Sequence, residues 1–153
     1  MNDTKIIIDT ANSFVLAAER CMEMRALEKD SFQMLMIPAM VCAAFGVEVY
    51  FKSILTNEGI NEEYVKKKIG HDLCKLFSHL SEESQVKLKQ HFENDANFIQ
   101  RLETIANGFV TWRYIYECSN QNLHVDLDFL NRLSQASKIL AESKIKELEN
   151  KNP

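Results

Sequence analysis

The longest apolar stretch of the chain lies between residues 34 and 55, and its pattern predicts a buried helix. Apolar residues recur there at spacings of three and four and occupy nearly every side of the helix they would form. A helix that is apolar all round is buried by its neighbours or lies in a membrane. Gln33, Pro38 and Gly46 interrupt the uncharged run, so we expect Pro38–Leu55 to be the central helix of a globular fold.

The residues before this stretch predict one long amphipathic helix. A run from about Thr4 to Leu27 keeps helical spacing, and Asn2 or Asp3 is placed to cap it. Its expected buried stripe consists of Ile7, Ala11, Phe14, Ala18 and Cys21, and Ile8, Val15 and Met22 are expected to widen it. The polar segment 28–31 is expected to form the turn into the central helix.

Beyond the central helix, the sequence predicts shorter helices separated by glycines and polar caps. Gly59 and Gly70 are expected to end helices, while Asn61 and Ser81 are expected to begin them. The expected elements are helices over 61–69 and 71–80, a helix from 81 to a break at 94–97, helical spacing over 98–112, and a last helix from Asp126 or Asp128 to about Glu149. The aromatic stretch 109–116 would also suit a strand, so its conformation stays open, and 118–126 is expected to be a loop.

The composition favours a single all-α domain. A chain of 153 residues can bury a core in one domain, and 4 glycines and 2 prolines are few for a sheet protein with its many turns. We therefore expect a bundle of four long helices plus short helices over residues 1–153, with its core at about 4–149.

Charge and cysteine usage narrow the class of protein further. The net charge of −4 disfavours broad electrostatic binding of nucleic acid and leaves only a local basic patch for such contacts. The 4 cysteines lie far apart, without a CxxC pair, which indicates reduced thiols. Because the N-terminal residues do not resemble a signal peptide, we expect a cytoplasmic protein. We also expect no membrane segment and no cofactor.

Two charged residues interrupt the apolar central helix. Glu48 and Lys52 lie one turn apart, with the acid first, which is the stabilising order for such a pair. Apolar stripes flank Glu48, so we expect its carboxylate to be buried, and a buried carboxylate needs a partner. Lys52, His71 and Arg113 are the candidate partners, and a simple surface ion pair is the alternative.

His71 and Asp72 begin a predicted helix and allow two interpretations. In the first, Asp72 caps the positive end of the helix and His71 bonds the backbone. In the second, His71, Arg113 and Tyr116 form a polar cleft for a phosphate, because arginine binds phosphate bidentately and tyrosine can stack on a base. A structural salt bridge between Arg113 and a glutamate is the alternative to this cleft.

A metal site and a basic nucleic-acid surface are less well supported. His71 and Cys74 could form half of a zinc site with Cys118 and His124, but their spacing fits no common zinc pattern. We therefore expect no metal. The lysines of segment 52–75 are nearly balanced by acids, which indicates a solvated face before a nucleic-acid site.

Three stretches, taken in order, resemble one superfamily. They are AAFGVEVYFKSIL at 43–55, GHDLCKLFSHL at 70–80 and FVTWRYIYE at 109–117. This order resembles HEPN domains, the all-α bundles of prokaryotic toxin–antitoxin and phage-defence systems, over roughly residues 39–140. The resemblance implies a homodimer that binds nucleotide, RNA or a cognate partner protein.

The chain departs from the HEPN signature at one point. Many HEPN domains are metal-independent ribonucleases in which a His, the proton carrier, follows an Arg by roughly four to six residues. After Arg113 the next histidine is His124, which lies beyond that window. The first interpretation is therefore a non-catalytic binding module with Glu48, Lys52, His71, Asp72, Arg113 and Tyr116 as its ligand residues. The alternative is a metal-independent ribonuclease that uses Arg113 with His124 or His71, so whether the chain is an enzyme stays open.

Overall fold

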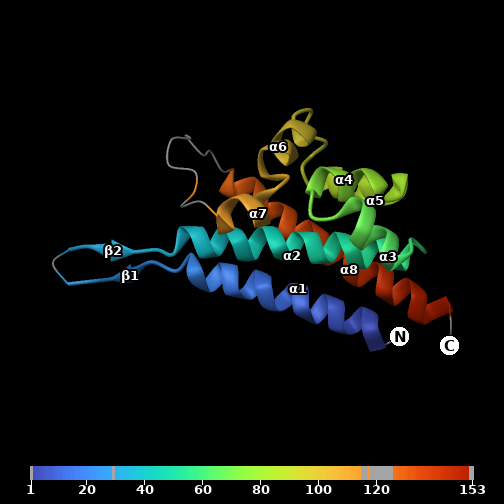
Figure 1. The fold of residues 1–153 in the computed structure, drawn as a ribbon, viewed down its shortest axis with the longest axis horizontal. Coiled ribbons are helices and arrows are strands. Elements are labelled where there is room, and N and C mark those ends of the chain that lie inside the picture. The colour runs from blue at the N-terminus through green and yellow to red at the C-terminus, as the bar shows by residue number, and fades with distance from the viewer. Residues whose placement is uncertain (1, 29, 115–116, 118–125, 152–153) are drawn as a thin grey trace.

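The apolar stretch around which the fold was predicted forms α2 (Met36–Asn57), the central helix of an all-α bundle. The computed structural model describes residues 2–28, 30–114, 117 and 126–151. The other long helices, α1 (Asn2–Cys21) and α8 (Leu127–Lys151), lie along α2 (Figure 1). The predicted all-α class is confirmed, although the described part contains three helices of twenty residues or more rather than four.

The burial of α2 is that of a core helix. Tyr50, Phe51, Ile54 and Leu55 are completely buried, and α1, α4, α7 and α8 pack around the helix. Among the described helices, α2 alone is long and apolar enough to cross a membrane, but 67% of its apolar window is buried inside the protein. Pro38 lies in the first turn, where its missing amide hydrogen breaks no intrahelical bond.

α1 approaches α2 closely through small residues. A side chain added at Gly46 of α2 would place its Cβ 2.6 Å from Cγ2 of Val15 and 3.4 Å from the carbonyl oxygen of Ala11. The close approach turns towards the core a stripe that agrees only in part with the prediction, since Ala11 and Ala18 were expected in it and Ile8 and Val15 were expected beside it. The buried residues are Ile8, Ala11, Val15 and Ala18, whereas Ile7, Phe14 and Cys21 are partly exposed.

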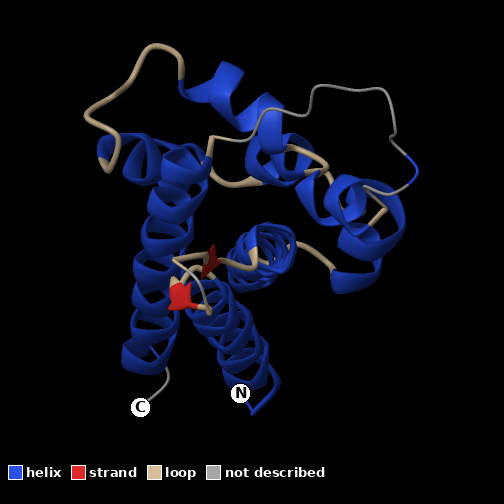
Figure 2. Cartoon of the chain, turned by 90° about the vertical axis from the view of Figure 1, so that its left-hand side faces the viewer, coloured by secondary structure: helices blue, strands red, loops and turns tan. Residues whose placement is uncertain are grey.

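The chain between α1 and α2 forms a β-hairpin, so the predicted extension of the first helix to Leu27 is wrong. Strands β1 (Arg25–Ala26) and β2 (Phe32–Gln33) pair antiparallel, with Arg25 opposite Gln33 and Ala26 opposite Phe32. Asp30, at φ 58°, takes the left-handed conformation in the turn. Figure 1 shows the hairpin projecting beyond the ends of α1 and α2, and Figure 2 shows helices in the rest of the described fold.

The expected polar caps are confirmed in the short helices after α2. Asn61 caps α3 (Glu62–Tyr64) by accepting from the Tyr64 amide at 3.1 Å, and Ser81 caps α5 (Glu82–Gln90). Asp72 caps α4 (Leu73–His79), since its Oδ1 accepts from the amide of Lys75 at 3.0 Å. The first interpretation of Asp72 is thus confirmed.

The stretch 61–69 is not one regular helix. After α3 the chain widens into a π-helical turn, η1 (Val65–Ile69), in which the amide of Gly70 donates to the carbonyl of Val65 five residues earlier. Gly59 and Gly70 have φ of 87° and 74°, as expected of glycines that end helices.

The predicted break at 94–97 divides the following helical stretch. Asn94 has a positive φ of 56°, and the chain then continues as α6 (Phe98–Ile105) and α7 (Gly108–Arg113). Residues 109–113 are therefore helical rather than extended. Arg101 holds this region to the start of α8: it donates to Asp95 at 3.1 Å and to Asp126 at 2.7 Å. The hydrogen bond from Arg101 lowers the pKa of the Asp126 carboxyl.

Candidate functional site

Glu48 is the centre of a polar cluster on the central helix. Its side chain is 1% exposed, and its Oε1 accepts hydrogen bonds from Nζ of Lys52 at 2.7 Å and from Nδ1 of His71 at 2.8 Å. The predicted burial and pairing of Glu48 are confirmed, with Lys52 and His71 as partners and without Arg113. In the described part of the chain, Oε2 of Glu48 is buried without a hydrogen-bond partner.

The turn between η1 and α4 carries His71 to this carboxylate. Gly70 adopts φ 74°, which an L side chain rarely takes, and so redirects the chain at the end of η1. The amide of Leu73 then donates to the carbonyl of Ala106 at 2.8 Å and ties the start of α4 to the turn before α7. The start of α4 and the turn before α7, which are far apart in sequence, are thereby brought to the same part of α2.

α7 adds an aromatic ring and a guanidinium beside His71. The imidazole of His71 lies 5.8 Å from the ring centre of Phe109, and Cζ of Arg113 lies 4.7 Å above the same ring. Phe45 stacks on Phe109 at 4.5 Å and anchors it, and Trp112, nearly one turn further along α7, is buried. Arg113 lies one turn beyond Phe109 and is exposed.

Arg113 is exposed, and its contacts are with aromatic rings. Besides Phe109, its guanidinium lies 4.8 Å from the ring centre of Tyr114. Among the described residues, which include Glu117, no carboxylate lies within ion-pair distance of Arg113. The alternative interpretation, a structural salt bridge to a glutamate, is therefore wrong for the part of the chain that is described.

The pairing with Glu48 fixes how the imidazole of His71 is presented. To bond the carboxylate, Nδ1 must carry the hydrogen, which leaves Nε2 to accept or donate a proton elsewhere. The ring is 53% exposed, and within the described structure Nε2 makes no hydrogen bond. A buried carboxylate that orients an exposed imidazole is an arrangement suited to binding an anion or moving a proton.

Several predicted site residues are not brought into this cluster. Tyr116 and His124 lie outside the described residues, as does Cys118. Asp72 serves as the helix cap described above. Burial raises the pKa of the Cys74 thiol to about 11, which disfavours the thiolate that a zinc site needs, and the described residues contain no group of three metal-ligating side chains.

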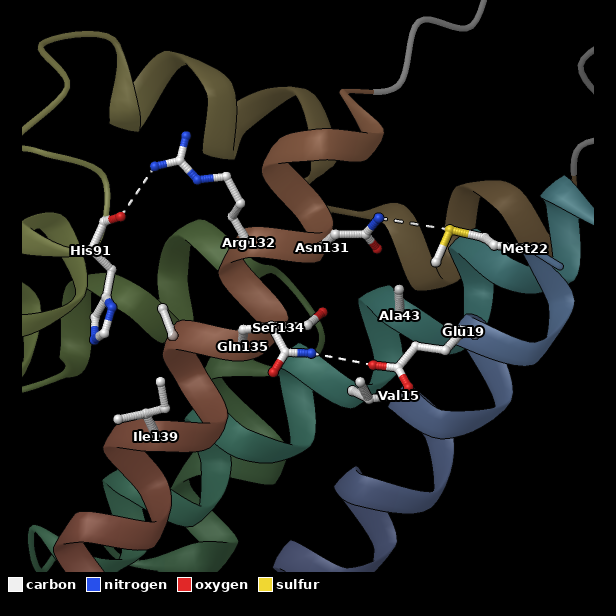
Figure 3. Close-up of a pocket in the computed structure, with 12 residues that line it drawn as sticks. Val15, Glu19, Met22, Ala43, His91, Asn131, Arg132, Ser134, Gln135 and Ile139 are labelled. Carbon is white, nitrogen blue, oxygen red and sulfur yellow. Dashed lines mark hydrogen bonds between the residues drawn. The ribbon is translucent and has the colours of Figure 1, made fainter.

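A groove lies between α1 and α8, but its polar groups bond to one another. It has a volume of about 430 Å³, and its apolar lining includes Val15 and Ala43 (Figure 3). On its rim, Nε2 of Gln135 donates to Glu19 at 3.2 Å, across the gap between the two helices. These contacts make the groove a packing feature rather than a prepared ligand site.

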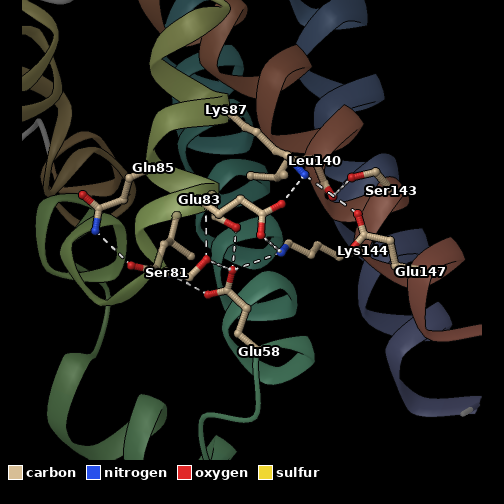
Figure 4. Close-up of polar contacts among 11 residues, drawn as sticks. Glu58, Ser81, Glu83, Gln85, Lys87, Leu140, Ser143, Lys144 and Glu147 are labelled. Atoms are coloured by element: carbon tan, nitrogen blue, oxygen red, sulfur yellow. Dashed lines mark hydrogen bonds and ion pairs between the residues drawn. The ribbon is translucent and has the colours of Figure 1, made fainter. Parts of the chain in front are cut away.

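A second polar cluster, which the sequence analysis missed, joins the end of α2 to α5 and α8. Glu58 accepts from the amide and hydroxyl of Ser81 at 2.8 and 2.6 Å and from the hydroxyl of Ser84, and Lys144 lies 3.6 Å from its carboxylate (Figure 4). In the sequence, the only indication of this cluster was Glu58 itself, an acid directly before Gly59 at the end of α2. Because the bonds of Glu58 connect three helices, we assign this cluster to stability.

Comparison with known proteins adds no evidence on the family or the function of this chain. No protein-family model, no curated protein and no solved structure matches this chain. The function is therefore argued from the cluster of Glu48, Lys52, His71, Phe109 and Arg113, which we call the α2–α7 site.

Proposed function

We propose that the chain is a non-catalytic, HEPN-like binding module that takes the phosphate of a nucleotide or of RNA at the α2–α7 site. The observation that carries the proposal is the exposed guanidinium of Arg113, which lies on two aromatic rings and has no acidic partner among the described residues. An arginine held in this way keeps its donors available for bidentate bonds to phosphate oxygens.

The neighbouring groups suit such a ligand. His71 offers its Nε2, and the exposed ring of Tyr114 can stack on a base. Lys52 adds a positive charge at the edge of the site, although part of it is neutralised by Glu48.

We propose an HEPN-like module because three stretches of the sequence resemble HEPN domains. All three contribute to the α2–α7 site: the first supplies Glu48 and Lys52, the second His71, and the third Arg113. A role in a prokaryotic toxin–antitoxin or phage-defence system is part of the same proposal.

We expect fluorescently labelled single-stranded RNA to bind the protein and the binding to weaken about ten-fold in Arg113→Ala, the loss of roughly one charge-assisted hydrogen bond. Fluorescence anisotropy at low salt measures this change, and the affinity should fall as salt is added. ADP should raise the melting temperature of the wild-type protein but not of Arg113→Ala.

Arg132 provides a matched control for this experiment. Its guanidinium also lies on a phenyl ring, 4.8 Å from the centre of Phe92, and is exposed in another part of the bundle. Arg132→Ala should therefore bind RNA as the wild type does. Equal binding by Arg113→Ala and wild type, or no wild-type binding at about 0.1 mM protein, would refute the proposed site.

One observation keeps a second function, metal-independent cleavage of RNA, under consideration. The Glu48–His71 pair presents an oriented imidazole, and the same Phe109 ring contacts both His71 and Arg113. In such an enzyme, Arg113 would stabilise the charged phosphorane while His71 moved the proton of the attacking 2′-hydroxyl. The usual spacing of arginine and histidine is missing, so we rank this function second.

We expect the purified protein, incubated with mixed-sequence RNA in EDTA, to show no cleavage that depends on Arg113. Gel analysis should compare the wild type with Arg113→Ala, His71→Ala and His124→Ala. The exposed His79, on the surface of α4, provides the control variant His79→Ala. Cleavage that disappears in Arg113→Ala and in either His71→Ala or His124→Ala, but persists in His79→Ala, would establish the ribonuclease instead.

A further inference from the structure

Glu48 lies at the centre of the α2–α7 site, but its carboxylate does not reach the solvent from which a ligand enters. The side chain is 1% exposed, and its Oε1 is bonded to Lys52 and His71. The other oxygen is buried and has no hydrogen-bond partner in the part of the chain that the structure describes. Any effect of Glu48 on a ligand therefore passes through the side chains that it holds.

Glu48 determines which nitrogen of His71 faces the solvent. An ionised carboxylate only accepts hydrogen bonds, so the 2.8 Å contact requires a hydrogen on Nδ1. In the neutral ring Nε2 then carries a lone pair, whereas in the imidazolium it carries a hydrogen. A lone pair repels a phosphate oxygen, and an N–H donates to it. Only the protonated ring can therefore add a hydrogen bond to a bound phosphate.

Phe109 holds His71 and Arg113 close enough to share one phosphate group. Its ring centre lies 5.8 Å from that of the imidazole and 4.7 Å from Cζ of Arg113. A phosphate makes hydrogen bonds of about 3 Å on each of its sides, so different oxygens of one phosphate can reach the guanidinium and Nε2. Protonation of His71 thus adds a second cation to the one that Arg113 supplies.

The protein without a ligand does not need this second cation. Lys52 already supplies a positive charge 2.7 Å from the carboxylate of Glu48. The imidazole of His71 is 53% exposed, so water can satisfy Nε2 of the neutral ring. The additional charge gains a partner only when an anion occupies the site.

His71 is the group of this site whose charge follows the pH. The charged and titratable residues on the helices around it are Glu48 and Lys52 on α2, Asp72 and Cys74 at the start of α4, Glu103 on α6 and Arg113 on α7. Burial raises the pKa of the Cys74 thiol to about 11, so this thiol stays neutral. Imidazole is the side chain that ordinarily changes charge between about pH 5 and 8, whereas carboxyl, amino and guanidinium groups ionise outside that range.

We propose that Glu48 is a positioning residue that couples phosphate binding at the α2–α7 site to the uptake of one proton by His71. The inference rests on the proposed function and adds to it how binding is regulated. The proton comes from the solvent and binds the lone pair of Nε2. Since the imidazolium attracts the anion and the neutral ring does not, the affinity is highest at low pH and falls as the pH rises. For one proton, the steepest change is about ten-fold per pH unit.

The test measures the binding of labelled single-stranded RNA without terminal phosphates, at constant salt, from about pH 5.5 to 8. The phosphodiesters of this probe keep their charge throughout, unlike a terminal phosphate, whose second pKa is about 6. Fluorescence anisotropy should show a wild-type affinity that falls about ten-fold or more across the range. His71→Asn, whose amide can still donate to Glu48 but does not titrate, should bind equally at both ends. His79, exposed on α4, provides the control His79→Ala, which should follow the wild type.

Two substitutions at Glu48 test its positioning role. Glu48→Gln retains an oxygen that can accept from Nδ1 of His71, so the affinity should still fall as the pH rises. Glu48→Leu removes the acceptor and leaves the ring free to turn, so most of the pH dependence should be lost. Circular dichroism shows whether both variants fold, and the comparison of wild type with His71→Asn does not depend on that result.

An affinity of the wild type that does not change with pH would overturn the inference, as would a pH dependence that survives in His71→Asn. A full pH dependence in folded Glu48→Leu would overturn the role given to Glu48. Each of these results leaves the proposed function intact if binding still requires Arg113. Absence of RNA binding at every pH would instead refute the proposed function, and the inference with it.

Discussion

Replacing Lys52 by Met should destabilise the protein by about 2–3 kcal/mol, whereas Glu48→Gln should cost less than about 1 kcal/mol. The asymmetry follows from burial. Glu48 is 1% exposed, but Lys52 and His71 are 26% and 53% exposed. Loss of Lys52 leaves the buried carboxylate of Glu48 with a single hydrogen bond among the described residues, the one between its Oε1 and His71. Loss of the Glu48 charge leaves the side chains of Lys52 and His71, which still reach water, and a glutamine oxygen can still accept from Lys52.

Urea denaturation of the two variants measures this difference, and a second ion pair provides the control. Lys67 and Glu63 have the same spacing and a 2.6 Å contact, but both are largely exposed. Lys67→Met should therefore change the free energy of unfolding by less than about 0.5 kcal/mol. If Glu48→Gln proves more damaging than Lys52→Met, the carboxylate is a net stabilising group and the argument from burial fails.

The second large effect is expected at Gly46, where α1 and α2 approach most closely. Gly46→Leu should destabilise by about 3 kcal/mol or more, since even its Cβ would lie 2.6 Å from Val15 and the rest of the side chain would force the helices apart. Gly46→Ala should cost about 1 kcal/mol, because the higher helix propensity of alanine offsets part of the clash.

A double-mutant cycle tests this explanation. Val15→Ala alone removes buried methyl groups and should destabilise by about 1–2 kcal/mol. Combined with Val15→Ala, the methyl group of Gly46→Ala occupies the space that Val15 has left, so the double variant should be no less stable than Val15→Ala alone. Additive losses, measured by thermal or urea denaturation, would show that close packing at Gly46 is not the cause.

Much of the fold could be predicted because local chemistry determined it. Asn61, Asp72 and Ser81 each begin a helix as expected, since a short polar side chain at that position bonds an amide which the helix leaves free. Likewise, because apolar residues occupy nearly every side of α2, the sequence predicted that it would be the buried central helix. The burial of Glu48 followed from the apolar residues on both sides of it.

The remaining features depend on contacts between distant segments. Residues 22–27 continue the helical period of α1 and also alternate, and the sequence alone does not decide between helix and strand. The π-helical turn before Gly70 and the carbonyl of Ala106 place His71 on Glu48, and neither is visible in the sequence. Arg113 was expected in the site, but its position on Phe109 required the packing of α7 against α2.

The order of the helices along the chain also has a consequence for synthesis. α1 and α2 are joined by residues 22–35 alone and can pair as soon as both have left the ribosome. α8, whose Phe129, Leu133 and Leu140 belong to the same core, emerges only after residues 58–126 have been translated. At roughly 5–20 residues per second, the side of α2 that α8 covers stays exposed for several seconds. Nascent chains that end before α8 are therefore expected to need a chaperone or to aggregate.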